Sequence, residues 1–70
     1  MKRWNTRDNR NEESPKIDAF LEEVIEVCRK HGMSISHEDG HGSFLVVPFS
    51  DGDADCLMHA DNSTGERKDD

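Results

Sequence analysis

The chain has 70 residues and a formal net charge of -7, with 36% charged and 31% hydrophobic residues. This length suits one small domain, and a core of fewer than roughly 70–80 residues rarely supplies more than about 3–5 kcal/mol without a metal, a disulfide or a partner. The sequence has no apolar run of membrane-spanning length and no signal-peptide pattern, so we expect a soluble, intracellular protein. The acidic charge disfavours direct binding of nucleic acid and favours basic protein partners.

Residues 1–13 are polar, rich in arginine and asparagine, and lack hydrophobic periodicity. Such a segment buries too little apolar surface to order itself. We therefore expect a disordered arm over residues 1–13, a single small α+β domain over residues 14–62 and a disordered tail over residues 63–70.

A helix is predicted to begin at Ser14-Pro15, because serine is a good N-cap and proline is favoured in the first helical turn. Apolar residues then recur with the spacing of an amphipathic helix, at Ile17, Phe20, Leu21, Val24, Ile25 and Cys28. His31 and Gly32 end this helix, and a left-handed Gly32 would turn the chain directly into the next element.

Two β-type runs flank Asp39-Gly40, which is a typical two-residue hairpin turn. With that turn, Glu38 faces His41 and Ile35 faces Phe44. The alternation of side chains then gives one apolar face toward the helix, Met33, Ile35, Phe44 and Val46, and a second apolar face formed by Leu45, Val47 and Phe49. A two-stranded sheet in so short a chain cannot cover both faces, so we expect a homodimer formed through the second face.

A shorter helix is predicted from Asp51 to about Asn62, after Pro48 has closed the second strand. Aspartates at positions 51, 53 and 55 suit the positive end of the helix dipole. The predicted fold class is therefore α+β in the order α-β-β-α: an N-terminal amphipathic helix, a two-stranded antiparallel hairpin and a short C-terminal helix, with disordered termini.

Two identical spacings, Cys28-x-x-His31 and Cys56-x-x-His59, would each place two ligands on one side of a helix, and together they could form a tetrahedral zinc site. Usual zinc sites place one pair on a tight knuckle, however, and Cys28 fits the apolar stripe as a buried core thiol. We therefore expect no metal and no cofactor, and a zinc-stabilised module stays an alternative.

The histidines near the turn, His37 and His41, followed by a helix with His59, also suggest a ββα-metal nuclease. The predicted alternation places His37 on the Met33 face and His41 on the Glu38 face, so the two imidazoles should not converge. The asparagine usual between such histidines is lacking, as is a basic surface that could face DNA. We expect a Glu38–His41 charge pair and no catalytic residue.

Residues 28–44, with the sequence CRKHGMSISHEDGHGSF, resemble a group of small, uncharacterised bacteriophage proteins that share a KHG-x-SISHEDGHG-x-F segment after an acidic helix. The resemblance covers about residues 16–60 and implies no activity. It implies an accessory protein made in the cytoplasm of an infected host, and the Cys56–His59 pair is not part of the shared pattern.

We therefore expect a non-enzymatic bacteriophage accessory protein that binds a host or phage protein through an acidic surface, for example during host takeover. The expected partner-binding residues are the second apolar face of the hairpin and the acidic residues of the helix and turn: Leu45, Val47, Phe49, Glu22, Glu23, Glu26, Glu38, Asp39 and His41. One alternative is an anti-defence inhibitor that mimics the charge of nucleic acid through Glu22, Glu23, Glu26, Glu38 and Asp39. The other is the zinc module or nuclease described above.

Overall fold

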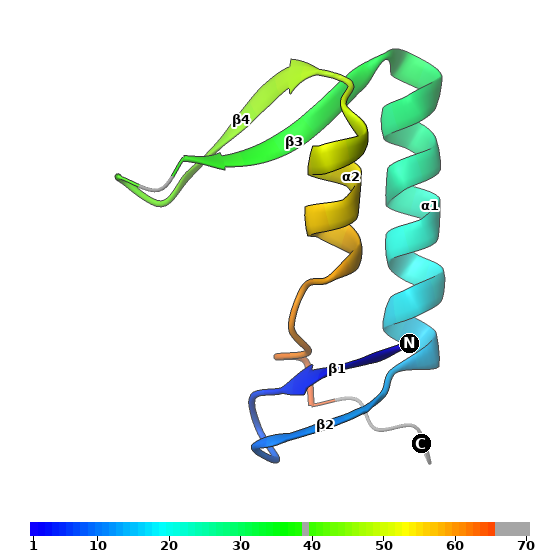
Figure 1. Ribbon diagram of the computed structural model, residues 1–70, viewed down its shortest axis with the longest axis vertical. Helices are drawn as coiled ribbons and strands as arrows, with labels where there is room; N and C mark the ends of the chain where they lie inside the picture. The colour runs from blue at the N-terminus through cyan, green and yellow to red at the C-terminus, as the bar shows by residue number, and fades with distance from the viewer. Residues whose placement is uncertain (39, 66–70) are drawn as a thin grey trace.

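Helix α1 (Pro15–His31) spans most of the height of the molecule (Figure 1). The computed structural model describes residues 1–38 and 40–65 of the chain. The helix begins and ends where the sequence predicts, with Pro15 in its first turn and Gly32 behind it in the left-handed conformation at φ 69°. Glycine adopts this conformation at little cost, and its N–H donates to the carbonyl oxygens of Cys28 and Arg29, which closes the helix.

The hairpin after α1 pairs β3 (Met33–Glu38) antiparallel with β4 (Ser43–Pro48). Its register differs from the prediction by two residues, because Glu38 lies opposite Ser43 and Ile35 lies opposite Val46. The predicted two-residue turn is wrong: residues 39–42 join the strands, and Gly42 has a left-handed φ of 69°. Side chains alternate with period two, so a shift of two residues leaves every side chain on its predicted face.

The order of elements is β-β-α-β-β-α, which corrects the predicted α-β-β-α order within the α+β class. Residues 1–13, expected to be a disordered arm, form β1 (Lys2–Asn5) and β2 (Arg10–Glu13), which pair antiparallel. This hairpin closes one end of the helix pair, and the β3–β4 hairpin projects from the other end (Figure 1). Of the predicted tail, residues 66–70 lie outside the described residues.

The β1–β2 hairpin is held to the helices by Arg3, a buried charged residue. Arg3 is 4% exposed, and its guanidinium donates to the carbonyl oxygens of Met58 and Ala60, both at 2.9 Å, and to the carboxylate of Asp18. Buried charges are stable only when they are paired and hydrogen-bonded in this way. The prediction of disorder considered only the burial of apolar surface. Polar contacts of Arg3 order this hairpin instead.

Backbone hydrogen bonds also join β1 to the segment that follows α2. The N–H of Asn62 donates to the carbonyl oxygen of Trp4 at 2.8 Å, and the N–H of Thr6 donates to the carbonyl oxygen of Asn62 at 2.9 Å. Asn5 and Asn62 are both almost fully buried and form an isolated parallel bridge. The segment after the second helix therefore lies beside β1, although more than fifty positions separate them in the sequence.

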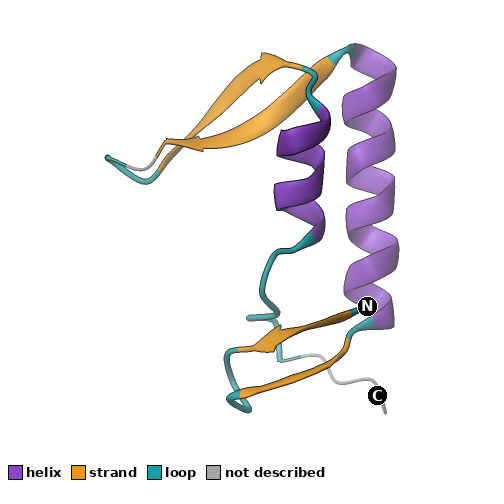
Figure 2. Ribbon diagram, in the orientation of Figure 1, coloured by secondary structure: helices purple, strands orange, loops and turns teal. Residues whose placement is uncertain are grey.

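Helix α2 (Asp51–Met58) runs antiparallel to α1 and beside it (Figure 2). It ends before the predicted limit at Asn62. Among the described residues, the apolar side chains that are buried are Leu21, Cys28 and Ala54. The backbone of β3 lies close to both helices, whereas the backbone of β4 lies close to no described element except β3. Neither helix in the described part of the chain has the length and apolar character that a membrane span requires.

Candidate functional site

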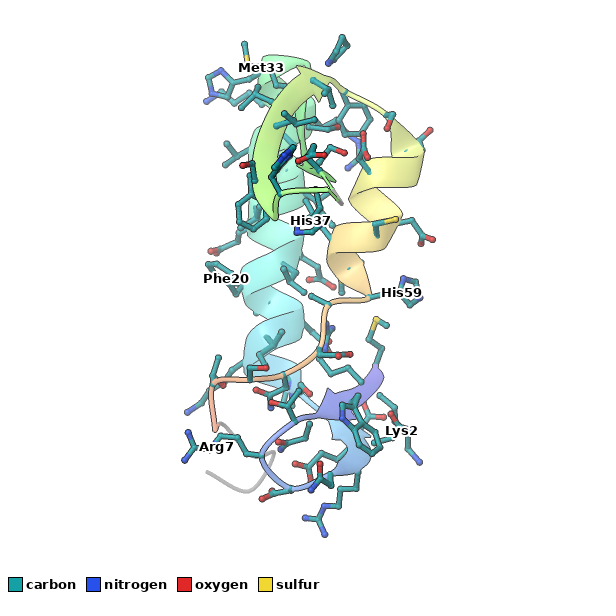
Figure 3. The ribbon with its side chains drawn as sticks, turned by 90° about the vertical axis from the view of Figure 1, so that its left-hand side faces the viewer. Lys2, Arg7, Phe20, Met33, His37 and His59 are labelled. Carbon is teal, nitrogen blue, oxygen red and sulfur yellow. The ribbon has the colours of Figure 1, made fainter. Side chains whose placement is uncertain are left out.

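An apolar groove lies between the β3–β4 hairpin and the two helices. Its volume is about 490 Å³ and it is lined by Phe20, Leu21, Val24, Ile35, Phe44, Leu45, Val46 and Leu57. Three of these side chains are strongly exposed: Phe20 at 63%, Phe44 at 72% and Val46 at 73%. In Figure 3 the hairpin lies in front of the upper part of α1, and Phe20 projects from α1 on the side away from α2. A contiguous exposed apolar surface of this kind is typical of a binding site.

The hairpin is anchored at the start of α2 through a small polar residue. Ser34 of β3 is buried, and its hydroxyl accepts a hydrogen bond from the backbone N–H of Ser50 at 2.9 Å. The larger side chains of the opposite face, including Phe44 and Val46, stay uncovered. The expectation that this face packs closely against α1 is therefore wrong, and it is the more exposed face of the hairpin.

The residues expected to form a dimer face lie in different surroundings. Val47 and Phe49 are half-buried, and the Arg29 guanidinium lies 5.3 Å from the centroid of the Phe49 ring. Leu45 is 44% exposed and lines the groove. The structure therefore does not present Leu45, Val47 and Phe49 as one exposed surface.

The acidic residues of α1 lie on two faces of the helix. Glu23 lines a hollow of about 320 Å³ beside the groove, together with Phe20, Val24, Val27, Cys28 and Ile35. Glu22 and Glu26 are exposed and lie two positions from Val24, which is about 200° around the helix. Of the helix acids expected to bind a partner, Glu23 is therefore the one that lies in a hollow beside the groove.

The carboxylate of Glu38 organises the described part of the hairpin loop. It accepts hydrogen bonds from the N–H groups of Gly40 and His41, both at 2.9 Å, and lies 3.1 Å from Nδ1 of His41. These bonds, led by the one from Gly40, lower the pKa of Glu38 below its ordinary value. The expected Glu38–His41 contact is present, but it forms within the loop rather than between paired strand residues. Asp39 lies outside the described residues.

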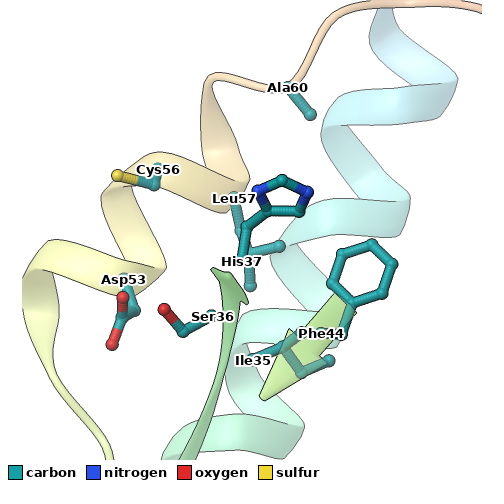
Figure 4. A pocket seen from close by; sticks show the side chains of 8 residues that line it. All are labelled: Ile35, Ser36, His37, Phe44, Asp53, Cys56, Leu57 and Ala60. Carbon is teal, nitrogen blue, oxygen red and sulfur yellow. The ribbon is translucent and has the colours of Figure 1, made fainter. Parts of the chain in front are cut away.

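A third hollow, of about 360 Å³, gathers polar side chains that could carry chemistry. It is lined by Ile35, Ser36, His37, Phe44, Asp53, Cys56, Leu57 and Ala60. Figure 4 shows the sulfur of Cys56 pointing away from the His37 ring. The His37 ring instead packs edge-on against Phe44, with ring centroids 5.7 Å apart. A nucleophile and its base must be within hydrogen-bonding reach, and the orientation of Cys56 does not direct its sulfur toward the His37 ring.

The two Cys-x-x-His pairs do not form a metal site. Cys28 is buried and Cys56 is exposed, and Nδ1 of His59 bonds instead to the carbonyl oxygen of Asp55 at 2.8 Å. Within residues 1–38 and 40–65, no three His, Cys, Asp or Glu side chains are placed to hold a metal ion. The zinc and nuclease alternatives therefore have no site in the described part of the chain.

No protein-family model matches the chain, and no match was found among the curated proteins or the solved structures. The function must therefore be inferred from the groove and its surroundings.

Proposed function

We propose that the chain is a non-enzymatic binding protein, an accessory protein of the bacteriophage kind, whose groove receives an amphipathic segment of a host or phage protein. The observation that carries this proposal is the exposure of Phe20, Phe44 and Val46 around one groove. Exposing large apolar side chains to water is unfavourable by roughly 1.5–3 kcal/mol each relative to burial, and a bound apolar side chain recovers part of this free energy. Such grooves commonly receive one face of an amphipathic helix.

The charges beside the groove indicate the chemistry of the partner. Glu23 and Asp53 each line a hollow next to the groove, and no lysine or arginine of the described residues lines the groove or these hollows. The chain as a whole carries a net charge of -7. A segment with one apolar face and basic flanking residues would match both the groove and its rim, and charge complementarity would speed its encounter with the protein.

Synthetic peptides test this proposal directly. A helical peptide of leucine and lysine is titrated against the labelled protein, and a peptide in which glutamate replaces lysine serves as the comparison. We expect the basic peptide to bind and the acidic peptide not to bind. Phe20→Ser should weaken binding of the basic peptide about tenfold, as expected for an apolar anchor worth more than about 1 kcal/mol. Because Phe20 is exposed, circular dichroism should show an unchanged fold.

Two neighbouring glutamates provide a matched control for general charge attraction. Glu23→Lys changes the rim of the groove, whereas Glu22→Lys makes the same charge change on the opposite face of α1. We expect the first variant to weaken binding several-fold and the second to leave it nearly unchanged at physiological salt. Equal effects of the two variants, or equal binding of the acidic peptide, would contradict the proposal.

A further inference from the structure

The outer edge of β4 is a second uncovered surface, formed by the backbone of a strand whose side chains Phe44, Leu45 and Val46 line the groove. On one side β4 pairs with β3, and within the described residues no other strand pairs with its outer edge. Its sequence, Ser43–Pro48, contains no charged residue. Edge strands usually carry charges, internal prolines or a covering element that prevents pairing with another chain. Here Pro48 stands at the end of the strand, and the residues before it are unprotected.

The hydrogen-bond pattern of the hairpin shows which backbone groups point outward. The N–H of Phe49 donates to the carbonyl oxygen of Gly32 at 2.9 Å, and this pair continues the register of β3 and β4. Hydrogen-bonded and non-hydrogen-bonded pairs alternate along an antiparallel ladder. The odd-numbered residues of β4 therefore direct their backbone groups toward β3, and Phe44 and Val46 direct theirs toward solvent.

We propose that two copies of this chain pair through these edges, with β4 antiparallel to β4 of the second copy and the two-fold axis at Leu45. In this register Phe44 of each copy lies opposite Val46 of the other. Every outward N–H then meets an outward carbonyl oxygen across the axis. Pro48 has no N–H and lies beyond the paired segment, so it removes no hydrogen bond.

Symmetry favours a second copy as the partner. A two-fold axis makes this edge self-complementary, because the exposed Phe44 of each copy meets the exposed Val46 of the other and the same contact forms twice. Two chains of net charge -7 repel each other across acidic surfaces, and the uncharged β4 lets them approach. Pairing also covers part of two strongly exposed side chains in a chain whose own buried core is small. This proposal does not rest on peptide binding by the groove.

Disulfide crosslinking tests the register. Leu45→Cys is made with Cys56→Ser, because Cys56 is exposed. Across the axis the two position-45 residues form a non-hydrogen-bonded pair with Cα atoms about 4.5 Å apart, which is within disulfide range. We expect a covalent dimer on oxidation. Ser43→Cys in the same background is the control, since position 43 lies opposite Val47 of the second copy and should not crosslink.

A backbone substitution tests whether the edge holds the dimer. Val46→Pro removes an outward N–H but no bond to β3. Val46→Thr keeps that N–H and, like the proline substitution, reduces the apolar surface of the side chain. In sedimentation at high micromolar concentration, we expect the wild type and the threonine variant to be dimers and the proline variant to be a monomer with unchanged circular dichroism. A monomeric wild type, or crosslinking at position 43 as readily as at position 45, would overturn the proposal.

Discussion

Asp18 is the acidic residue of α1 that binds both the N-terminal ammonium group and Arg3 of β1. Partial burial of its carboxyl acts to raise its pKa, but hydrogen bonds from the N-terminal ammonium group and Arg3 outweigh this and lower the pKa below the ordinary 3.8. The ammonium group lies 2.6 Å from one carboxylate oxygen, and this contact raises the pKa of the amino group. The ionised form of Asp18 therefore stabilises the folded state.

The contribution of Asp18 should be lost in acid. Because its pKa is lower in the folded chain than in the unfolded chain, its stabilisation is complete above the unfolded value and disappears as the pH falls through the folded value. Asp18→Asn should lower the free energy of unfolding by about 1–3 kcal/mol at pH 7, and its difference from the wild type should shrink below the ordinary pKa of 3.8. Urea denaturation across this range measures the difference.

The matched control for this experiment is Asp61→Asn, which changes an exposed carboxylate. We expect little effect of this variant at any pH, since exposed carboxylates contribute little to stability. If the Asp18→Asn curve ran parallel to the wild-type curve down to the acid limit, the assigned role of Asp18 would be wrong.

At the scale of the elements, the two helices begin with serines that act differently. Ser14 stands at the N-terminus of α1 as predicted, but its side chain makes no capping bond and donates instead to the carbonyl oxygen of Glu12 at 3.3 Å. Ser50 caps α2: its hydroxyl oxygen accepts from the N–H of Asp53 at 3.1 Å and donates to the Asp53 carboxylate at 2.7 Å. Serine therefore provides a side-chain cap for α2 but not for α1.

This difference predicts unequal effects of the same substitution. Ser50→Ala should destabilise the chain by about 1 kcal/mol, because an N–H at the start of α2 loses its partner. Ser14→Ala should cost less than half as much, since the N-terminal N–H groups of α1 do not depend on that hydroxyl. Thermal unfolding followed by circular dichroism compares the variants, and a larger loss for Ser14→Ala would refute the assignment of the caps.

At the scale of the whole molecule, the β1–β2 hairpin belongs to the same folded unit as the helices. Arg3 bonds to the end of α2 at Met58 and to Asp18 of α1, and the Asn62 backbone bonds on both sides of Asn5. Trp4 is the one tryptophan of the sequence and lies in β1, so its fluorescence reports on this hairpin. Circular dichroism reports mainly on the helices.

We therefore predict that the fluorescence of Trp4 and the helical signal change together in urea, as they do in two-state unfolding. Arg3→Met should destabilise the hairpin by about 3 kcal/mol, because Asp18 and two carbonyl oxygens lose a buried partner, and the fluorescence change should then occur at lower urea. Arg7→Met makes the same replacement at an exposed position and should change neither signal. A wild-type fluorescence signal without a cooperative transition would contradict the structure of this hairpin.

Much of the local structure was predictable from the sequence. Both ends of α1 follow from Pro15 and Gly32, because capping depends on residues within one helical turn. The faces of the β3–β4 hairpin were predicted correctly despite the wrong register, since side-chain direction depends on parity alone. The contact between Glu38 and His41 also follows from their proximity in the sequence.

Only the tertiary structure decided which side chains are buried and which stay exposed. The ordering of residues 1–13 depends on Arg3 meeting carbonyl oxygens more than fifty positions away, and no local pattern reveals such a partner. The exposure of Phe20 and Phe44 was equally hidden, because their spacing is that of core residues and only the packing of the hairpin against the helices leaves them uncovered. Short-range patterns determine how the backbone turns, whereas burial depends on contacts between distant segments, and the groove is a product of those contacts.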